Sequence, residues 1–489
     1  MKKQVISFVT AYPTEGAGSG TLITAQAKTY VEMGHEVHII TANNNTNFKK
    51  LPGVQYHLVP FTGEKEPIEK LEGALPFNFL MFTSHTNSSA NFWNVSLEDL
   101  KAYCAKFKEI YQKHIEEVHP DIFHGQHCWI STALLCDQGI PVITTIHGTD
   151  LMGYTRARDT LAEINEKIEA GENSKEIFDE KKKYEFYIKC AEKAAEKSEK
   201  IFVISNEQER KFKSLFPFAA DKVQLVRNGC DTTVFHKEDV DVKQVLSGLQ
   251  SNITPDGKIP TDYNKLALFV GKFAGFKRVD LVLDAAKIYE EKKTQEGKKV
   301  MTLIVGAGAL DEELKKHQKE LELKNTHFVG RQGADVVTAL QSSADVFLAP
   351  SDNEPDGLVY KEAMLCGNVP VGTLGGGVPD TINPENAELT PVEGTEAYPT
   401  PYGVLIPMDN AQALADAAMY VMENPEKFDK KEIMQYALDN YDQRGISKKV
   451  IIPTFEETIE NFNTRKTSQT SQLSQTPRRF KALDDDDER

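Results

Sequence analysis

Two series of short apolar segments constrain the fold of this chain most strongly, because each segment leads into a glycine-rich or charged loop and then a helical stretch. The first series opens with an apolar strand over residues 4–11 and a loop that contains Gly16, Gly18 and Gly20, followed by helical spacing over 21–33. This order of strand, loop and helix is typical of a doubly wound α/β fold with a parallel sheet.

The same pattern restarts in the second half of the chain. Apolar strands are expected at Leu266–Gly271, Thr302–Val305 and Val346–Ala349, after a polar and turn-rich stretch over 240–263. We therefore predict two Rossmann-like domains with parallel sheets. The predicted division is 1–235 for the first domain, 236–264 for a linker or insertion, 265–440 for the second domain, 441–463 for a helix that crosses back to the first domain, and 464–489 for a disordered tail.

Composition narrows the functional classes. The net charge of −16 argues against a broad basic surface for nucleic acid. No apolar run reaches the roughly 18 residues of a membrane span, and the N-terminus lacks the apolar region of a signal peptide. The six cysteines show no C-x-x-C spacing, which favours free thiols over a zinc site. We predict a cytoplasmic protein, and the composition leaves association with a membrane surface open.

The most informative segment is 351–364, which follows a predicted strand. In open α/β sheets, ligands bind at this edge. The amides of Gly357 and Leu358 at the start of the next helix would favour an anion. Glu354 and Glu362, about two helical turns apart, are placed to accept hydrogen bonds from hydroxyl pairs of a sugar and a ribose. Taken alone, the segment fits a surface loop equally well.

A second charged loop, 271–278, also follows a predicted strand. Its Lys272 and Lys277 are close enough in sequence to hold one diphosphate and to stabilise charge on a leaving group. A solvated basic turn is the alternative reading of this loop.

Two loops of the first half complete the pattern. Residues 16–20 would allow close backbone approach to a phosphate, but they match neither G-x-G-x-x-G nor a Walker loop. His147 follows a predicted strand, where it would bond a substrate or serve as a buried structural histidine. His124 and His127 flank the end of another strand and are less specific. Together, the loops place charge and glycine at one edge of both sheets, as a ligand between two domains requires.

These segments resemble the family-four retaining glycosyltransferases, also called glycosyl transferases group 1, which have the GT-B fold. The resemblance runs from residue 1 to about 460 and includes an E-x7-E motif. It implies two domains that face each other across a cleft. The segments that carry it are Gly34–Val37, His147–Asp150, Asn228–Phe235, Gly271–Lys272 with Lys277, Glu354–Glu362, Glu362–Met364, Gly367–Val371 and Gly375–Gly377.

The resemblance implies catalytic roles for matching positions. Lys272 and Lys277 would hold the diphosphate, Glu354 would contact hydroxyls of the donor sugar, and His147 would lie beside that sugar. The first lysine is usually arginine in this family, so Lys272 loses bidentate geometry.

Further positions are assigned to donor binding, together with the amides of Gly357 and Leu358. Glu362 would bond the ribose and Arg331 would lie along the base. Gly18 matches the second glycine of a pair, with Ala17 in the place of the first. Asp356 stands where the family usually has an aromatic residue, which would change the pocket around the donor sugar.

The resemblance also implies a mechanism. The anomeric configuration is retained by front-face attack, and the leaving diphosphate helps to deprotonate the acceptor. This needs no enzymic nucleophile, no cofactor and no essential metal, because lysines and helix dipoles supply the positive charge. The donor is a nucleotide-diphosphate sugar, and the domains are expected to close over it. UDP-glucose, UDP-N-acetylglucosamine and GDP-mannose all remain open.

The first domain should select a hydroxyl acceptor, which the sequence does not identify among carbohydrates, lipids and small molecules. We place His85 and His127 as acceptor contacts. Residues 75–95, part of an insertion over 66–100, either cover the acceptor mouth or form a packed surface loop. Two other functions stay open: a GT-B nucleotide-sugar epimerase, and an inactive scaffold that binds a nucleotide sugar.

Overall fold

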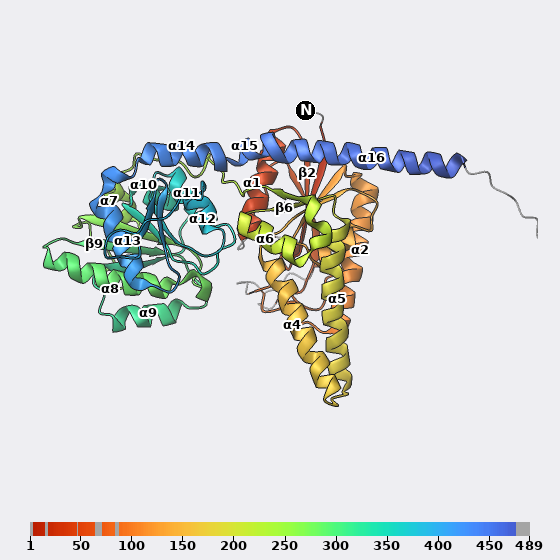
Figure 1. Cartoon of the computed structure of the whole chain (residues 1–489), viewed down its shortest axis with the longest axis horizontal. Coiled ribbons are helices and arrows are strands. Elements are labelled where there is room, and N and C mark those ends of the chain that lie inside the picture. Colours follow the sequence, from red (N-terminus) through yellow and green to blue (C-terminus); the bar gives the residue numbers. More distant parts are fainter. Residues whose placement is uncertain (1–2, 15–17, 46, 64–70, 84–87, 476–489) are drawn as a thin grey trace, which may run out of the picture.

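The first half of the chain forms a seven-stranded parallel sheet. A computed structural model describes residues 3–14, 18–45, 47–63, 71–83 and 88–475, and within them this sheet has the order β3-β2-β1-β4-β5-β6-β7 (Figure 1). The order reverses between β1 and β4, so a crevice is expected at the carboxyl ends of these strands. The strands are β1 (Val5–Thr10), β2 (Glu36–Asn43), β3 (Val54–Pro60), β4 (Ile122–Gln126), β5 (Val142–Thr145), β6 (Lys200–Val203) and β7 (Val223–Leu225).

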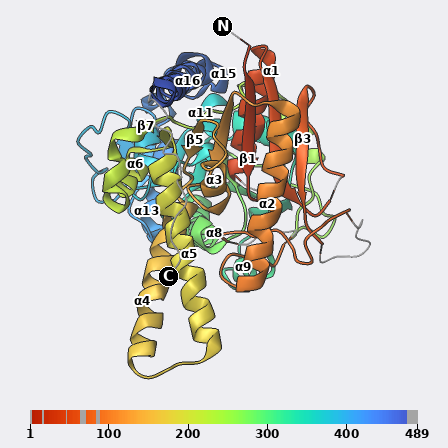
Figure 2. The same ribbon diagram turned by 90° about the vertical axis from the view of Figure 1, so that its right-hand side faces the viewer.

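Helices cover both faces of this sheet, and two of them form a long hairpin. Helices α4 and α5 project well beyond the rest of the domain (Figures 1 and 2), and their sequence over 156–200 is rich in Lys and Glu. Serine side chains cap the starts of three helices: Ser96, Ser174 and Ser205. The helices are α1 (Gly18–Glu32), α2 (Leu97–Val118), α3 (Ile130–Leu135), α4 (Thr149–Glu169), α5 (Lys175–Lys197), α6 (Asn206–Leu215) and the 3₁₀ turn η1 (Pro217–Lys222).

The second half repeats this plan. Its sheet has the order β10-β9-β8-β11-β12-β14-β13, with strands parallel except β13, which pairs antiparallel with β14 at the edge. The predicted pair of doubly wound domains, the GT-B arrangement, is therefore confirmed. The strands are β8 (Lys265–Val270), β9 (Val300–Val305), β10 (Thr326–Gly330), β11 (Val346–Ala349), β12 (Pro370–Thr373), β13 (Tyr398–Thr400) and β14 (Gly403–Ile406).

The segment 236–264, predicted to be a linker or insertion, packs into the core of the second domain. Leu246, Leu249 and Ile259 are buried in one core with strand residues of β8 and β9. Burial of these scattered apolar side chains outweighs the polar composition of the segment. The helices of this half are α7 (Val242–Ser247), η2 (Gly275–Lys277), α8 (Val279–Gln295), α9 (Asp311–Glu320), α10 (Ala334–Ser343), α11 (Leu358–Leu365), α12 (Val378–Ile382), α13 (Ala411–Glu423) and η3 (Pro425–Lys427).

The end of the chain returns to the first domain. Helix α14 (Lys430–Tyr441) packs on the second domain, and α15 (Gln443–Ile446), the π-helical turn η4 (Ser447–Ile451) and α16 (Ile452–Gln475) lie across the first (Figure 1). Along this path, Phe455 is fully buried among residues of the first sheet.

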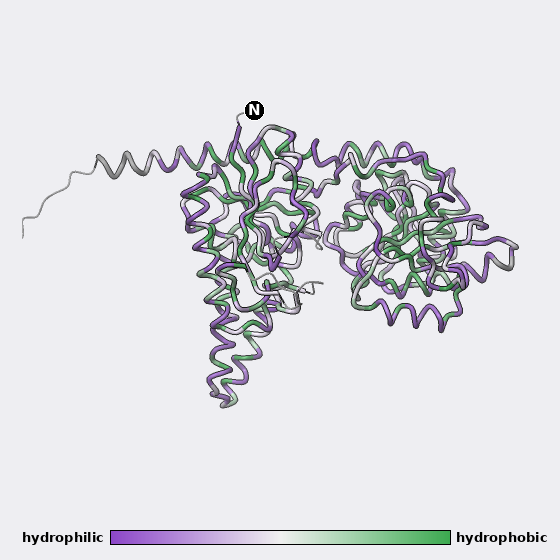
Figure 3. The backbone as a smooth tube through the Cα atoms, turned by 180° about the vertical axis from the view of Figure 1, so that it is seen from behind, coloured by the Kyte–Doolittle hydropathy of each residue, from purple (hydrophilic) through white to green (hydrophobic). Residues whose placement is uncertain are grey.

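Helix α16 continues to Gln475, into the stretch 464–489 that was predicted to be a disordered tail. Residues 476–489 lie outside the described part of the chain. Hydrophobic residues concentrate in the two sheets, whereas α4, α5 and α16 contain many hydrophilic residues (Figure 3).

Candidate functional site

Every described residue assigned to the site lies in a loop that follows the carboxyl end of a strand, or in the helix after that loop. In the second domain, Lys272 and Lys277 follow β8, Arg331 follows β10, and Glu354 follows β11. These strands are parallel, so their loops gather at one edge of the sheet.

Lys277 and Glu354 form a direct ion pair between the loops after β8 and β11. Each side chain keeps 15% of its surface exposed, so the pair is largely shielded from water but accessible from one side. Glu354 lies just before Gly357, whose left-handed backbone (φ 73°) begins α11 at Leu358. The structure therefore brings the predicted lysine, the predicted carboxylate and the start of the helix together.

Glu362 lies on α11, beyond this ion pair. Burial raises the pKa of its carboxyl to about 7, against the opposing charge of Lys277. The charge of one predicted site residue therefore acts on another, although no direct contact joins them. A half-shielded carboxylate of this kind is stabilised when a ligand donates hydrogen bonds to it from hydroxyl groups.

Lys272 and Arg331 line a separate small pocket of about 190 Å³. Gly306 and Ala307, after β9, form another wall of this pocket. Burial lowers the pKa of the Lys272 ammonium, and the nearby charge of Arg331 lowers it further. Two cations that share one pocket favour an anionic or electron-rich ligand.

The role of Arg278 is not evident from the sequence. Its backbone is left-handed (φ 50°), and its guanidinium bonds Asp280 at 2.8 Å, lies 3.6 Å from Asp352, and pairs with Asp409. These contacts fix the loop that carries Lys277 to the loops after β11 and β14. The distant acidic partners gave no local signal in the sequence.

In the first domain, the predicted histidines are part of one polar group. His147 Nε2 lies 2.8 Å from Gln126 Oε1, and His127 Nε2 lies 2.6 Å from the hydroxyl of Tyr12. The two imidazole rings are 4.7 Å apart. The Tyr12 hydroxyl also lies 3.2 Å from that of Ser19, so the group reaches the start of α1.

Both histidines are uncharged near neutral pH. Burial lowers the pKa of His147 and of His127 to about 3. For His147, the neighbouring His127 lowers the pKa further, while Asp150 opposes the shift. The Asp150 carboxylate accepts hydrogen bonds from the amides of Cys128 (2.8 Å) and His147 (3.2 Å), which fixes the loop after β5. Neutral imidazoles can bond hydroxyl groups without adding charge.

Gly18 begins α1 beside Ser19, and a Cβ atom placed on it would meet no described atom within 4 Å. No described residue therefore blocks approach to this backbone. His85 lies outside the described residues.

The loop that carries His147 in the first domain meets the loop that carries Glu354 in the second domain. A Cβ on Gly148, the residue after His147, would lie 2.8 Å from Pro355 Cγ, and Pro355 is the residue after Glu354. The loop that carries the predicted histidine therefore touches the loop that carries the predicted carboxylate. Ser205 adds a hydrogen bond from its hydroxyl to the carbonyl of Pro355 at 2.7 Å.

A second contact joins the domains next to it. The backbone amide and the side-chain amide of Asn206, at the start of α6, donate to the Asp380 carboxylate on α12 at 2.6 and 3.0 Å. Arg227 donates to the carbonyl of Asp380 at 3.2 Å. We call this set of contacts between Asn206, Arg227 and Asp380 the domain seam. No local pattern in the sequence identified it.

Asp356, which stands where the family usually has an aromatic residue, makes its contacts within the protein. It is buried, pairs with the Lys361 ammonium, and accepts a hydrogen bond of 3.0 Å from Asn228. Lys361 also donates to the carbonyl of Asn228 at 3.2 Å. The carboxylate therefore attaches α11 to the segment that leaves the first domain.

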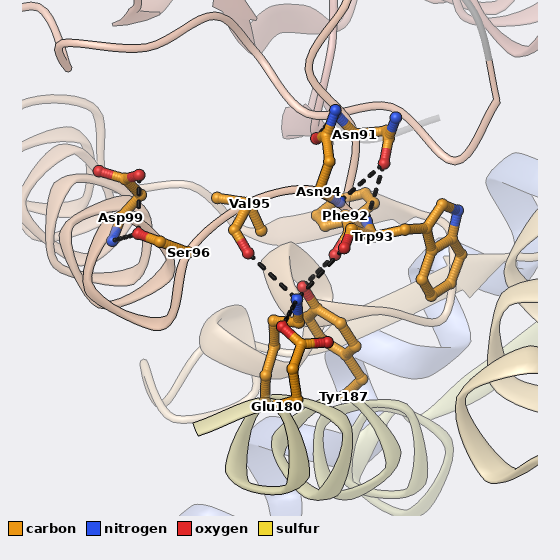
Figure 4. A network of polar contacts seen from close by, with 10 residues as sticks. Asn91, Phe92, Trp93, Asn94, Val95, Ser96, Asp99, Glu180 and Tyr187 are labelled. Atoms are coloured by element: carbon orange, nitrogen blue, oxygen red, sulfur yellow. Dashed lines mark hydrogen bonds and ion pairs between the residues drawn. The ribbon is translucent and has the colours of Figure 1, made fainter. Parts of the chain in front are cut away.

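Residues 75–95 are packed where the structure describes them. Phe82 is buried against His127 and Trp129, with ring centres 5.3 and 5.2 Å apart. Tyr187 of α5 donates to the carbonyl of Phe92, and Lys183 of the same helix donates to the carbonyls of two further residues, Trp93 and Val95 (Figure 4). Phe82 of this insertion therefore packs directly against the His127 ring.

Comparison with known families decides the identity. The family described as Glycosyltransferase Family 4 matches residues 16–234, and the family described as Glycosyl transferases group 1 matches residues 252–437. The chain belongs to the family-four, group 1 glycosyltransferases. It is a glycosyltransferase that transfers a sugar from a nucleotide-sugar donor, and retention of configuration is consistent with this membership.

Two curated members of this glycosyltransferase group are similar over most of their length. The N-acetyl-alpha-D-glucosaminyl L-malate synthase of Bacillus anthracis is 25% identical over 380 residues, covering 76% of this chain and 80% of the relative. The D-inositol 3-phosphate glycosyltransferase of Saccharomonospora viridis is 23% identical over 427 residues, covering 84% and 82%.

Solved structures share the fold of this glycosyltransferase at low identity. The HepE protein of Anabaena, in complex with UDP and glucose, aligns with a TM-score of 0.61 at 15% identity, over 92% of this chain and 99% of that one. The sucrose-phosphate synthase of Thermosynechococcus elongatus aligns with a TM-score of 0.60 at 15% identity, over 96% of this chain and 100% of that one.

In the described residues, no helix is long and apolar enough to cross a membrane.

Proposed function

We propose that this glycosyltransferase is a retaining hexosyltransferase whose donor lies between Lys277, Glu354 and the start of α11. The contact between Gly148 and Pro355 supports the proposal most directly, because it places the loops that carry His147 and Glu354 against each other. A donor held by one loop is then within reach of the other.

In this proposal, the diphosphate replaces Glu354 as the partner of Lys277. The ammonium and the amides of Gly357 and Leu358 would neutralise the charge that grows on the leaving group. Glu354 is then free to accept hydrogen bonds from sugar hydroxyls. Glu362 would do the same for the ribose. The ion pair thus holds both groups in place before the donor arrives.

We assign Lys272 and Arg331 to the distal part of the donor, since they share one pocket. Their guanidinium and ammonium groups suit the base and the phosphate nearest to it. Gly18 would let the diphosphate approach the start of α1. His147 and His127, both neutral, would orient hydroxyls of the donor sugar and the acceptor. We expect no divalent ion to be needed for this chemistry.

For the donor and acceptor, we propose a UDP-sugar and a small polar hydroxyl compound. The two similar relatives are named for L-malate and D-inositol 3-phosphate, and one similar structure contains UDP and glucose. These names support the choice of compounds for a first panel.

The test is a donor panel of UDP-glucose, UDP-N-acetylglucosamine and GDP-mannose, each with L-malate, inositol 3-phosphate or a simple sugar, read by release of nucleoside diphosphate and by mass of the product. We expect a product in which the sugar is linked to the acceptor, and we expect one donor to be preferred. An epimerase would return an isomerised sugar without a new linkage, and an inactive scaffold would bind donors without turnover. Either outcome would reject the proposal.

The site assignment is tested by Lys277→Ala and Glu354→Ala, which we expect to lower turnover by roughly two or more orders of magnitude. Asp439→Ala, on the exposed face of α14, is the control and should leave turnover unchanged. Near-normal rates in both purified site variants would place the donor elsewhere. Turnover that persists in excess chelator would support a reaction without a catalytic metal.

A further inference from the structure

Three histidines from distant parts of the first domain converge on one point. His38 lies on β2, His57 on β3 and His114 in the last turns of α2, and one ring nitrogen of each lies within 4.8 Å of the others. His38 Nδ1 and His57 Nε2 are 3.0 Å apart. The centroid of the His114 ring lies 4.4 Å from that of His57.

The remaining nitrogens of two rings already have partners outside the cluster. His38 Nε2 lies 3.2 Å from the Glu36 carboxylate, and His114 Nε2 lies 2.8 Å from the hydroxyl of Ser7. A proton on each of these outer nitrogens leaves the lone pair of the inner nitrogen directed at the cluster. Partners of this kind orient histidine ligands around metal ions in proteins.

One inner nitrogen is left unsatisfied. The side chain of His114 is only 1% exposed. Among the described residues, its Nδ1 atom has no hydrogen-bond partner. A buried nitrogen without a partner is costly. A neutral imidazole nitrogen that lacks a protein partner can serve as a metal ligand.

We propose that His38 Nδ1, His57 Nε2 and His114 Nδ1 bind one divalent transition-metal ion of the Zn²⁺ type. Imidazole nitrogens suit Zn²⁺, which binds them at about 2.0–2.1 Å in tetrahedral geometry. An ion would separate the hydrogen-bonded pair slightly and draw His114 inward. His57 is only partly buried, so water can supply a fourth ligand.

The place of this cluster indicates a structural role. The three strand residues Ser7, His38 and His57 lie in the middle or amino-terminal half of their strands, whereas the donor loops follow the carboxyl ends. An ion there joins α2 to β2 and to the edge strand β3, and its binding energy adds to folding stability. The site is therefore independent of the catalytic proposal.

Metal binding by the full chain tests this site. The tag-free protein is stripped with a chelator and titrated with Co²⁺ and, separately, with Zn²⁺. We expect about one ion per chain, the visible absorption of four-coordinate Co²⁺, its loss when Zn²⁺ is added, and a higher melting temperature with Zn²⁺. Wild-type protein that binds neither ion, or that gains no stability with Zn²⁺, would overturn the proposal.

Variants separate this site from adventitious binding. His57→Asn, at a partly exposed position, should abolish binding and the rise in melting temperature, with folding checked by circular dichroism. Glu36→Gln, which replaces the outer carboxylate with a neutral amide, should weaken affinity on the order of 10-fold. His119→Asn, an exposed histidine near His114, is the matched control and should bind like wild type. Equal binding by His57→Asn and wild type would also reject the site.

Discussion

At the scale of single residues, the buried carboxyl of Glu362 links the donor site to stability. Its folded pKa is about 7, above the ordinary value of 4.5, so the folded state holds the proton more tightly than the unfolded state. The contribution of this protonation to the free energy of unfolding is fully present below about pH 4.5. It is lost as the pH rises through about 7.

Glu362→Gln should therefore stabilise the protein without donor only at high pH. Glutamine resembles the protonated carboxyl, so we expect little change at pH 5 and a gain of up to roughly 3 kcal/mol at pH 8. Urea unfolding at the two pH values measures the difference. The same change at both would show that ionisation of Glu362 does not govern stability. Donor affinity should fall in this variant at either pH.

The buried pair of Asp356 and Lys361 makes a second prediction. Asp356→Ala leaves the Lys361 ammonium, 1% exposed, without its carboxylate, and should cost about 3–5 kcal/mol in the free energy of unfolding. The double variant Asp356→Leu, Lys361→Met should recover most of this loss, because it removes both charges. A loss in the double variant equal to that of the single one would mean that packing, not charge, controls the site.

At the scale of elements, the start of α6 and helix α12 hold the domain seam. Asp380→Ala removes the acceptor of both Asn206 bonds, each of the charged type that contributes about 1.5–3 kcal/mol. We expect a larger radius of gyration in small-angle X-ray scattering and a higher KM for the donor. Asp380→Asn, which keeps one oxygen acceptor, should show a smaller effect. An unchanged radius would mean that other contacts set the domain arrangement.

The elements themselves were largely predictable, because strands such as β1, β8, β9 and β11 are short apolar runs that lead into a loop and a helix. The site loops were predictable for the same reason: Lys277 and Glu354 follow strands that lie next to each other. The segment 236–264 was not, since Leu246, Leu249 and Ile259 are scattered among polar residues and become core only through tertiary contacts. The cluster of His38, His57 and His114 depends wholly on pairing between distant segments.

At the scale of the whole molecule, α16 stabilises the first domain although it comes last in the chain. Phe455 is fully buried, with its ring 5.4 Å from that of His124 and 6.0 Å from that of Tyr30. Phe455→Ala should cost about 3–5 kcal/mol and expose the C-terminal helix to protease. Phe462→Ala, on the same helix and partly exposed, is the control. Equal protease resistance in both variants would show that α16 is held elsewhere.

The polypeptide passes between the domains twice, and the two passages are attached to each other. The amide of Cys230 donates to the carbonyl of Tyr441 at 2.8 Å, and the amide of Gln443 donates back to the carbonyl of Cys230 at 3.0 Å. A Cβ on Gly229 would lie 2.6 Å from the Cα of Gln443. Such a double strap resists twisting and sliding. We expect these paired crossings to guide opening and closure of the two domains about a single axis.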